Sequence, residues 1–396
     1  MPISQIGTNA IEAGAVTAAD LATGAVNLAS STVTGSLPAA NGGTGTSAGV
    51  TGFKNRIING AMVISQRNGT SSVTLDGASA YTLDRWQGYD ATDGSFTVQQ
   101  TTTAPTGFNN SLKVTVATTD TSLGATQFAF LRQFIEGYNV ADLGFGTANA
   151  KTVTLSFWVY SSLTGTFGGV LGNDNGDRGY PFTYTISSAN TWEQKSVTIV
   201  GDTTGTWLKT NGVGIAVTFG LGVGSTYSGT AGSWQAGFYV SATGATNVMA
   251  TSGATFYITG VQLEVGSTAT SFDVRPYGQE LLLCQRYCEV WNSTTENVAV
   301  SVMAPNPNNT FQLAGFVPFT VQKRTSPSIS YSGAGTFNNV WLGNASTPSD
   351  VNFGSAGDKG MNVNITSSTN QGSYSTRLFL NGGALSSNYI IVSAEL

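Results

Sequence analysis

The sequence predicts an all-β protein with an extended N-terminal stem, a jelly-roll β-sandwich, one short helix and a small C-terminal β domain. Glycine occurs 50 times in 396 residues, which is typical of many tight turns. Charged residues make up only 9% of the chain, against about 25% in typical soluble domains. Aromatic residues at 10% and hydrophobic residues at 40% nevertheless supply enough apolar surface for a packed core.

Charge and composition exclude several classes of function. The net charge is −5, and no Lys/Arg cluster offers the cations that phosphate binding requires, so we expect no nucleic-acid partner. No run of 18 uncharged apolar residues occurs, so we expect no membrane insertion. The first ten residues lack the basic and apolar regions of a signal peptide, which predicts that the protein is made in the cytosol and is not exported by that route. Histidine is absent, which rules out Ser-His-Asp and Cys-His catalysis.

Residues 1–50 form the predicted stem. Apolar residues recur every five positions, which matches neither a helix nor a strand. Three copies wound around one axis could bury them, which favours an intertwined or surface-docked trimer stem; a disordered linker is the alternative. A glycine-rich joint at 38–45 ends the segment. The predicted oligomer contacts of the stem are Ile6, Ile11, Val16, Leu21 and Val26.

Residues 51–276 are predicted to form the sandwich. In the segment 151–160, Val153, Leu155, Phe157 and Val159 alternate with more polar residues, the pattern of a half-buried strand. Eight or more such strands without an intervening helical period favour an antiparallel jelly roll. Further strands are predicted at 94–99, 111–117, 126–135, 193–200, 212–219 and 254–265.

A short amphipathic helix is predicted over 277–290. It places Leu281, Cys284, Cys288 and Trp291 on one face. In a trimer this face would pack at the axis, with Leu281, Cys284 and Cys288 as oligomer contacts; in a monomer it would lie across the sandwich. The two cysteines are expected to be buried, inert thiols.

Residues 291–396 are predicted to form a second, smaller β domain, the tip. Strand-like segments occur at 317–319, 374–380 and 388–392.

Several segments together resemble the receptor-binding proteins of tailed-bacteriophage tail fibres. The segment 37–45 is similar to the joint between stem and head in such proteins. The segments 55–62, 65–67 and 81–86 resemble the opening of the receptor-binding sandwich, and 258–266, 272–276 and 285–287 its closing strand and exit. The last residues, 392–396, resemble fibre C-termini.

The resemblance implies a virion tail fibre with a carbohydrate-binding-module-like jelly roll and trimeric assembly. Its N-terminus would bind other tail or baseplate proteins, and its outer domains would bind host surface polysaccharide. It implies no cofactor and no catalytic residue. A structural capsid or baseplate decoration protein without receptor binding is the alternative, and a glycan depolymerase spike is a further one.

Exposed aromatic residues are the natural saccharide-binding candidates, with core packing as the alternative for each. Loops at the free end of a fibre are a favourable place for such residues. The low content of charge suits a neutral glycan. The candidates in the sandwich are Trp86, Tyr89 and Trp207, and those in the tip are Tyr331, Phe337 and Trp341.

Acidic residues offer weaker alternatives. Asp174 and Asp177 lie in a glycine-containing loop that resembles part of a calcium loop, but an Asx-rich turn explains the same residues. A glycosidase needs a pair of carboxylates. The candidates for such a pair are Asp84, Asp90, Asp93, Asp174, Asp177, Glu193, Glu264 and Asp273, and solvated turns are the alternative for them.

Overall fold

The computed structural model describes residues 53–174, 176–292, 298–306, 309–332, 337–341, 344–346, 348–367, 376–380 and 389–396. Gly52–Leu396 form one compact unit. The predicted oligomer contacts of the stem, Ile6, Ile11, Val16, Leu21 and Val26, lie outside the described residues. The predicted domain limits stay predictions.

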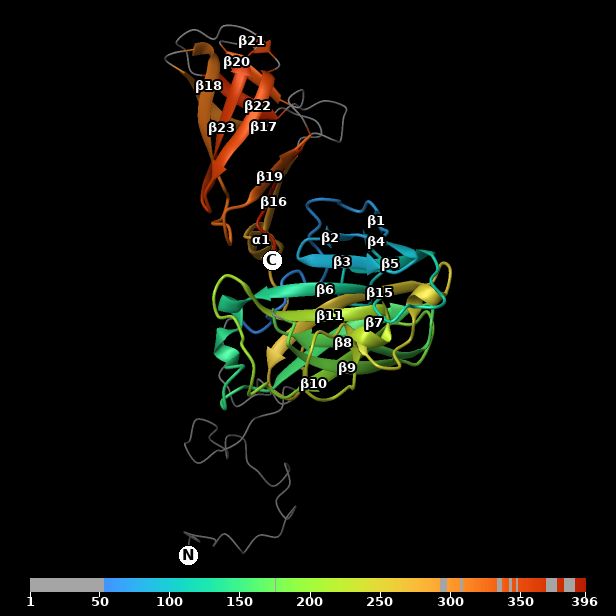
Figure 1. Cartoon of the computed structure of the whole chain (residues 1–396). Helices are drawn as coiled ribbons and strands as arrows, with labels where there is room; N and C mark the ends of the chain where they lie inside the picture. Colours follow the sequence, from blue (N-terminus) through green and yellow to red (C-terminus); the bar gives the residue numbers. More distant parts are fainter. Residues whose placement is uncertain are drawn as a thin grey trace, which may run out of the picture. The chain divides into compact units, whose positions relative to one another are not determined.

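Two antiparallel sheets form the sandwich (Figure 1). The six-stranded sheet has, in spatial order, β1 (Val73–Leu75), β4 (Ser95–Thr101), β5 (Ser111–Thr118), β15 (Thr255–Val265), β7 (Val153–Ser161) and β10 (Glu193–Ile199). The seven-stranded sheet has β13 (Gln235–Ala236), β9 (Arg178–Ile186), β8 (Gly165–Gly172), β11 (Val213–Val223), β6 (Phe128–Glu136), β3 (Trp86–Ala91) and β2 (Ser79–Leu83). The predicted all-β, jelly-roll fold class is confirmed.

Period-2 alternation accounts for the core between the two sheets. On β7, Val153, Leu155, Phe157 and Val159 are fully buried, and Phe157 packs edge-on against Phe219 of β11 with the ring centroids 5.0 Å apart. The strands predicted from alternation are all present, within a few residues of their expected limits. Short connections complete the sandwich: η3 (Gly137–Asn139), η4 (Ala141–Leu143), η5 (Ser225–Tyr227), η6 (Val248–Ala250) and the parallel pair β12 (Ser228–Gly229) and β14 (Ser241–Ala242).

The C-terminal region contains two further sheets around a separate apolar core. One sheet has β16 (Cys288–Asn292), β25 (Tyr389–Ser393) and β19 (Ser328–Tyr331). The other has β21 (Asn344–Ser346), β20 (Phe337–Trp341), β24 (Thr376–Leu380), β17 (Val298–Asn306), β18 (Asn309–Pro318), β23 (Gly360–Ser367) and β22 (Pro348–Ala356).

The helix is shorter than predicted. The helix α1 spans Tyr277–Gln285, and Cys288 instead begins strand β16, where it pairs with Ser393. From Cys288 onward the chain therefore forms backbone hydrogen bonds with β25 and does not continue the predicted helix. Among the described residues, no helix has the length and apolarity needed to cross a membrane.

The predicted oligomer contacts on this helix are wrong for both cysteines. Cys284 and Cys288 are fully buried within a single chain, and Cys284 packs in a small core with Ile58 and Ile64. Leu281 packs partly buried against the same core, so the helix lies against the sandwich. Burial raises the pKa of both thiols, as expected for inert cysteines.

Four of the segments that resemble fibre proteins, 65–67, 81–86, 285–287 and 392–396, are linked by ion pairs, hydrogen bonds and a cation–π contact. Glu395 pairs with both Arg67 and Arg85, and the Arg85 guanidinium lies 3.6 Å over the Tyr287 ring. The Tyr287 hydroxyl donates to Glu136 over 2.6 Å. Gln66 likewise donates to Asp84 (2.7 Å) and to the Cys288 carbonyl (2.8 Å). These contacts therefore hold the segments 65–67 and 81–86 against the residues that follow α1 and against the C-terminus.

Candidate functional site

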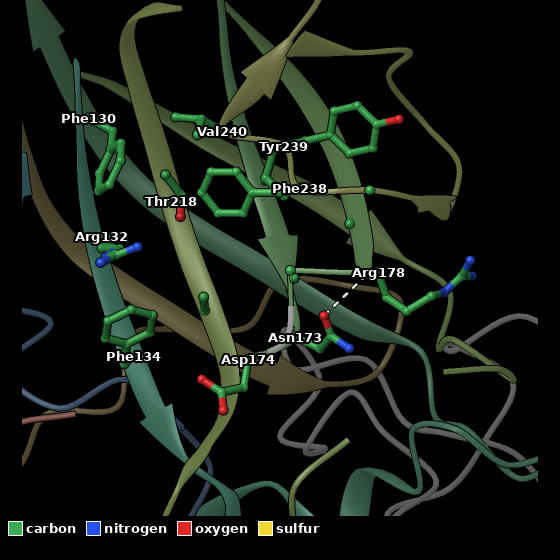
Figure 2. A pocket seen from close by; sticks show the side chains of 16 residues that line it. Phe130, Arg132, Phe134, Asn173, Asp174, Arg178, Thr218, Phe238, Tyr239 and Val240 are labelled. Atoms are coloured by element: carbon green, nitrogen blue, oxygen red, sulfur yellow. Dashed lines mark hydrogen bonds between the residues drawn. The ribbon is translucent and has the colours of Figure 1, made fainter. Parts of the chain in front are cut away.

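A shallow hollow lies on the outer face of the seven-stranded sheet, and β6 forms one side of it (Figure 2). Alternation along β6 turns Ala129, Leu131 and Ile135 into the core. The residues between them, Phe130, Arg132 and Phe134, line the hollow. Two aromatic rings thus flank one cation along a single strand.

Small side chains form the floor. Thr218 of β11 pairs in register with Arg132 on one side and with Val170 of β8 on the other. One step along the strands, Ala216 pairs with Phe134 and with Gly172. A row of Gly, Ala, Val and Thr leaves room above the sheet between taller side chains.

The segment after β11 forms the opposite side. Gly220 allows the close approach of this segment, because a Cβ there would lie 2.7 Å from that of Ser241. The Phe238 ring packs at the rim against Tyr227 (5.5 Å) and over Gly176, whose positive φ of 63° suits glycine. Phe238 is 43% exposed and so presents an open aromatic surface to the hollow (Figure 2).

A polar turn closes one end of the hollow. The Asn173 side-chain oxygen accepts hydrogen bonds from the backbone N–H groups of Asp177 (3.2 Å) and Arg178 (3.1 Å). This is the Asx-rich turn predicted as the alternative to a calcium loop. Asp174 and Asp177 are exposed, and no group of three or more candidate metal ligands occurs among the described residues. Asp174 lines the hollow, whereas Arg178 is bound to Asp202 by two hydrogen bonds.

The position of the Arg132 side chain is set by one hydrogen bond and two aromatic rings. Its Nε donates to the Gln87 side-chain oxygen over 2.7 Å. Its guanidinium lies over the rings of Phe134 (4.1 Å) and Phe130 (4.9 Å). Burial lowers the pKa of Arg132 to about 10, so the group remains charged at neutral pH.

Two other hollows differ in chemistry. One of about 230 Å³ has the Phe108 and Phe272 rings in its lining, but its polar groups Asn55, Arg275 and Glu280 are bound to one another or to backbone. A second, of about 320 Å³ on β18, β23 and β22, has polar side chains and no aromatic ring in its lining. The hollow beside β6 is smaller, about 90 Å³, so a ligand would lie across the face rather than inside a pocket.

The sandwich aromatics predicted as ligand platforms have other roles. Trp86 is fully buried in the core and donates its indole N–H to the Asn59 carbonyl, so that prediction is wrong. Trp207 is 8% exposed and is enclosed by Phe145 and Trp234, which rules it out as an open platform. Tyr89 lies on the same outer face as the hollow, edge-on to Phe130 at 5.6 Å, but does not line it.

The structure does not show the predicted tip residues together in one site, because Tyr331 alone among them has a described side chain. Tyr331 is half-buried on β19, where its hydroxyl donates to the Val351 carbonyl over 2.6 Å and its ring packs against Phe353. Phe337 and Trp341 lie at the two ends of β20, and their side chains are outside the described part of the chain. They stay predictions.

The residues that build the hollow carried a readable signal. Phe128, Phe130, Arg132 and Phe134 stand at every second position, so a strand must place them on one face. Because the other face of the strand is also apolar and packs in the core, this aromatic row lies on the outer face of the sheet. Phe238 carried no such signal, because its place depends on how a loop crosses the sheet.

Most of the acidic candidates hold loops rather than facing a ligand. Asp84 is bound by Gln66, Asp90 by Thr92, and Glu264 by Thr270. Asp273 accepts from the Asn55 backbone, and Glu193 pairs with Lys195. Among the described lining residues of the hollow, Asp174 is the single carboxylate.

No protein-family model matches the chain, and no curated protein matches it. The solved structures that resemble parts of it include the following three. A putative sugar-binding protein from Bacteroides thetaiotaomicron VPI-5482 has 13% identity over 54% of this chain and all of its own, with a TM-score of 0.32. The enzymatically active domain of tailspike protein 4 from bacteriophage CBA120 has 14% identity over 55% of this chain and 22% of its own (TM-score 0.29). A family 11 carbohydrate-binding module from Clostridium thermocellum, in complex with a mixed-linked tetrasaccharide, has 10% identity over 50% and 98% (TM-score 0.27).

Proposed function

We propose that this protein is a non-enzymatic adhesin that binds saccharide in the hollow between β6 and Phe238, as part of a phage tail fibre. The observation that carries the proposal is the convergence of the exposed Phe238 and the half-buried Phe134 above a floor of small side chains; Phe130 is buried and lies under the Arg132 guanidinium. Sugar rings present C–H faces that stack on such aromatic surfaces. The polar groups Arg132 and Asp174 can orient a ligand by hydrogen bonds, as a small number of polar groups do in an apolar site.

The chemistry of the hollow supports binding rather than cleavage. A glycosidase requires two carboxylates on opposite sides of the scissile bond, about 5 to 9.5 Å apart. The described lining of the hollow supplies one, Asp174. We therefore expect the protein to release no new reducing ends from a bound polysaccharide.

The fibre role rests on the sequence resemblance described above. Three copies of one shallow site on a trimer raise the effective affinity by about 10²–10⁴ without new contacts. Residues 1–50 would attach the trimer to the virion, and the sandwich would carry the saccharide site. Weak single contacts made in parallel suit reversible attachment to a cell surface.

Binding to an array of surface polysaccharides tests the proposal. We expect Phe238→Ala to reduce retention of the bound glycan at least about tenfold, since truncating a buried or stacking aromatic at a binding centre is among the largest effects. The matched control is Tyr138→Ala, which removes an aromatic that is 62% exposed and does not line the hollow. Phe316→Ala in β18 removes an exposed tip aromatic in the same way.

Unchanged binding by Phe238→Ala would contradict the proposed site. Loss of binding in Phe316→Ala alone would instead place the site in the tip.

A further inference from the structure

Among the described arginine side chains, all except that of Arg132 have either a carboxylate partner or several backbone carbonyl acceptors. Six of them have a carboxylate partner, and Arg324 donates to three backbone carbonyls. The pairs are Arg56 with Asp142, Arg67 and Arg85 with Glu395, Arg178 with Asp202, Arg275 with Glu280, and Arg286 with Glu136. Arg132 has no carboxylate partner among the described residues, and its two terminal amino groups have no hydrogen-bond partner there.

This departure has an energetic cost. Removing a cation from water is unfavourable unless a paired charge or hydrogen bonds replace the lost hydration. Arg132 is half-buried and has only the Gln87 oxygen and two aromatic faces in return. The cost is offset once an anion occupies the space in front of the two free amino groups.

The shape of the guanidinium limits which anion fits. Its Nε edge is taken by Gln87, and its central carbon lies over the rings of Phe130 and Phe134. The free Nη1–Nη2 edge remains, and a planar carboxylate binds such an edge by two parallel hydrogen bonds. A lysine would provide charge but no such fork.

We propose that the hollow recognises an acidic saccharide, whose carboxylate binds the free edge of Arg132. This rests on the proposed function and names its ligand class: a sugar bearing a carboxylate, with its ring on Phe238. An acidic ligand differs from the neutral glycan expected from the low overall charge. The local charge at the site decides which ligand binds, and Arg132 supplies a cation there without a carboxylate partner.

The groups facing Arg132 set the geometry of this ligand. Across the floor, Thr218 and Ala216 are uncharged, and Gln87 on the next strand is neutral. Asp174, at the end of the hollow, is the one negative charge in the described lining. The carboxylate of the ligand therefore lies toward β6, and hydroxyls or an N-acetyl group lie toward Asp174.

The test compares acidic oligosaccharides with their carboxyl-reduced counterparts on the same full-length protein. The probes are oligomers containing glucuronic acid, galacturonic acid or N-acetylneuraminic acid, each before and after reduction to the neutral sugar. We expect tighter binding of at least one acidic form by about 10-fold to 100-fold, the range of a charge-assisted hydrogen-bonded pair. Arg132→Gln should lose this difference and bind both forms alike, and Arg132→Lys should recover only part of it. Asp174→Asn removes the one negative charge of the described lining and should therefore increase the ratio of acidic-form to reduced-form affinity.

Equal binding of acidic and reduced forms by the unmodified protein would overturn the inference without any variant that must fold. If that binding still required Phe238, the proposed function would stand and only the ligand class would fall. If no member of the panel bound, the proposed function would fall with it.

Discussion

At the scale of single residues, buried polar groups decide where this protein is rigid and where it can bind. Glu136 and Glu395 are each enclosed by two cationic or hydroxyl partners and fix the segments around them. Arg132 is the contrasting case, since it lines a hollow and its terminal amino groups have no hydrogen-bond partner among the described residues. The Tyr184 hydroxyl is buried in the core with no hydrogen-bond partner among the described residues.

Two tyrosine-to-phenylalanine changes should act in opposite directions. Tyr287→Phe removes a hydrogen bond of 2.6 Å to Glu136 and should lower the free energy of unfolding by about 1.5–3 kcal/mol. Tyr184→Phe removes an unsatisfied buried hydroxyl and should leave that free energy unchanged or raise it by about 1 kcal/mol. Urea unfolding of both variants measures this. Destabilisation by Tyr184→Phe as large as that by Tyr287→Phe would contradict the assignment.

Asp202 predicts a pH dependence of stability. Burial opposes ionisation, but hydrogen bonds from Arg178 and Thr204 prevail and hold the pKa of Asp202 below its usual 3.8. Because the folded-state pKa is the lower one, this stabilisation is fully present above the unfolded-state pKa. It is lost as the pH falls through the folded-state value.

The stability difference between wild type and Asp202→Asn should therefore be large at neutral pH and shrink below about pH 4. Unfolding free energies over this pH range measure it. A difference that stays constant across the range would show that the carboxylate charge does not matter.

At the scale of elements, strands were predictable because alternation is a local property. The segment 151–160 reads as a strand whatever surrounds it, and β7 confirms it. The helix was predictable only as far as Gln285, because pairing of Cys288 with Ser393 is a contact across more than a hundred residues. The hollow needed such contacts too: the row on β6 is visible in the sequence, but the Phe238 loop that completes it is not. Trp86 was misassigned for the same reason, since the sequence does not show which face of β3 meets the core.

Replacing Glu395, which follows strand β25, should strongly lower the stability of the protein. Glu395→Gln leaves two enclosed arginines, Arg67 and Arg85, without their carboxylate. We expect the free energy of unfolding to fall by about 3–5 kcal/mol, the cost of breaking a buried pair from one side. Urea unfolding measures it, with Glu193→Gln as the control.

Glu193 pairs with Lys195 nearer the surface, so its loss should cost below about 1 kcal/mol. Equal effects of the two changes would contradict the anchoring role of the C-terminus.

At the scale of the whole molecule, we propose a saccharide-binding sandwich joined to a trimer-forming stem. Cys284 of α1 and Cys288 of β16 are enclosed within one chain, so neither is available as a contact between chains. Tyr277 and Leu282 of α1 remain exposed at 63% and 46%. The predicted trimer contacts that stay predictions lie mainly in residues 1–50.

Light scattering of the full-length protein and of a truncated protein lacking residues 1–50 tests this division. Full-length protein should have a mass of about 123 kDa, three times 40.9 kDa. The truncated protein should be monomeric and remain folded. A trimer that survives truncation would move the contacts to the sandwich, the helix or the tip, and a monomeric full-length protein would contradict the fibre proposal.

The most direct test of the central claim is a crystal structure of the protein with a bound acidic oligosaccharide from the array. The account predicts a sugar ring against Phe238 and its carboxylate on the free edge of Arg132, above the floor formed by Ala216 and Thr218. A saccharide bound elsewhere, with this hollow filled only by water, would contradict it.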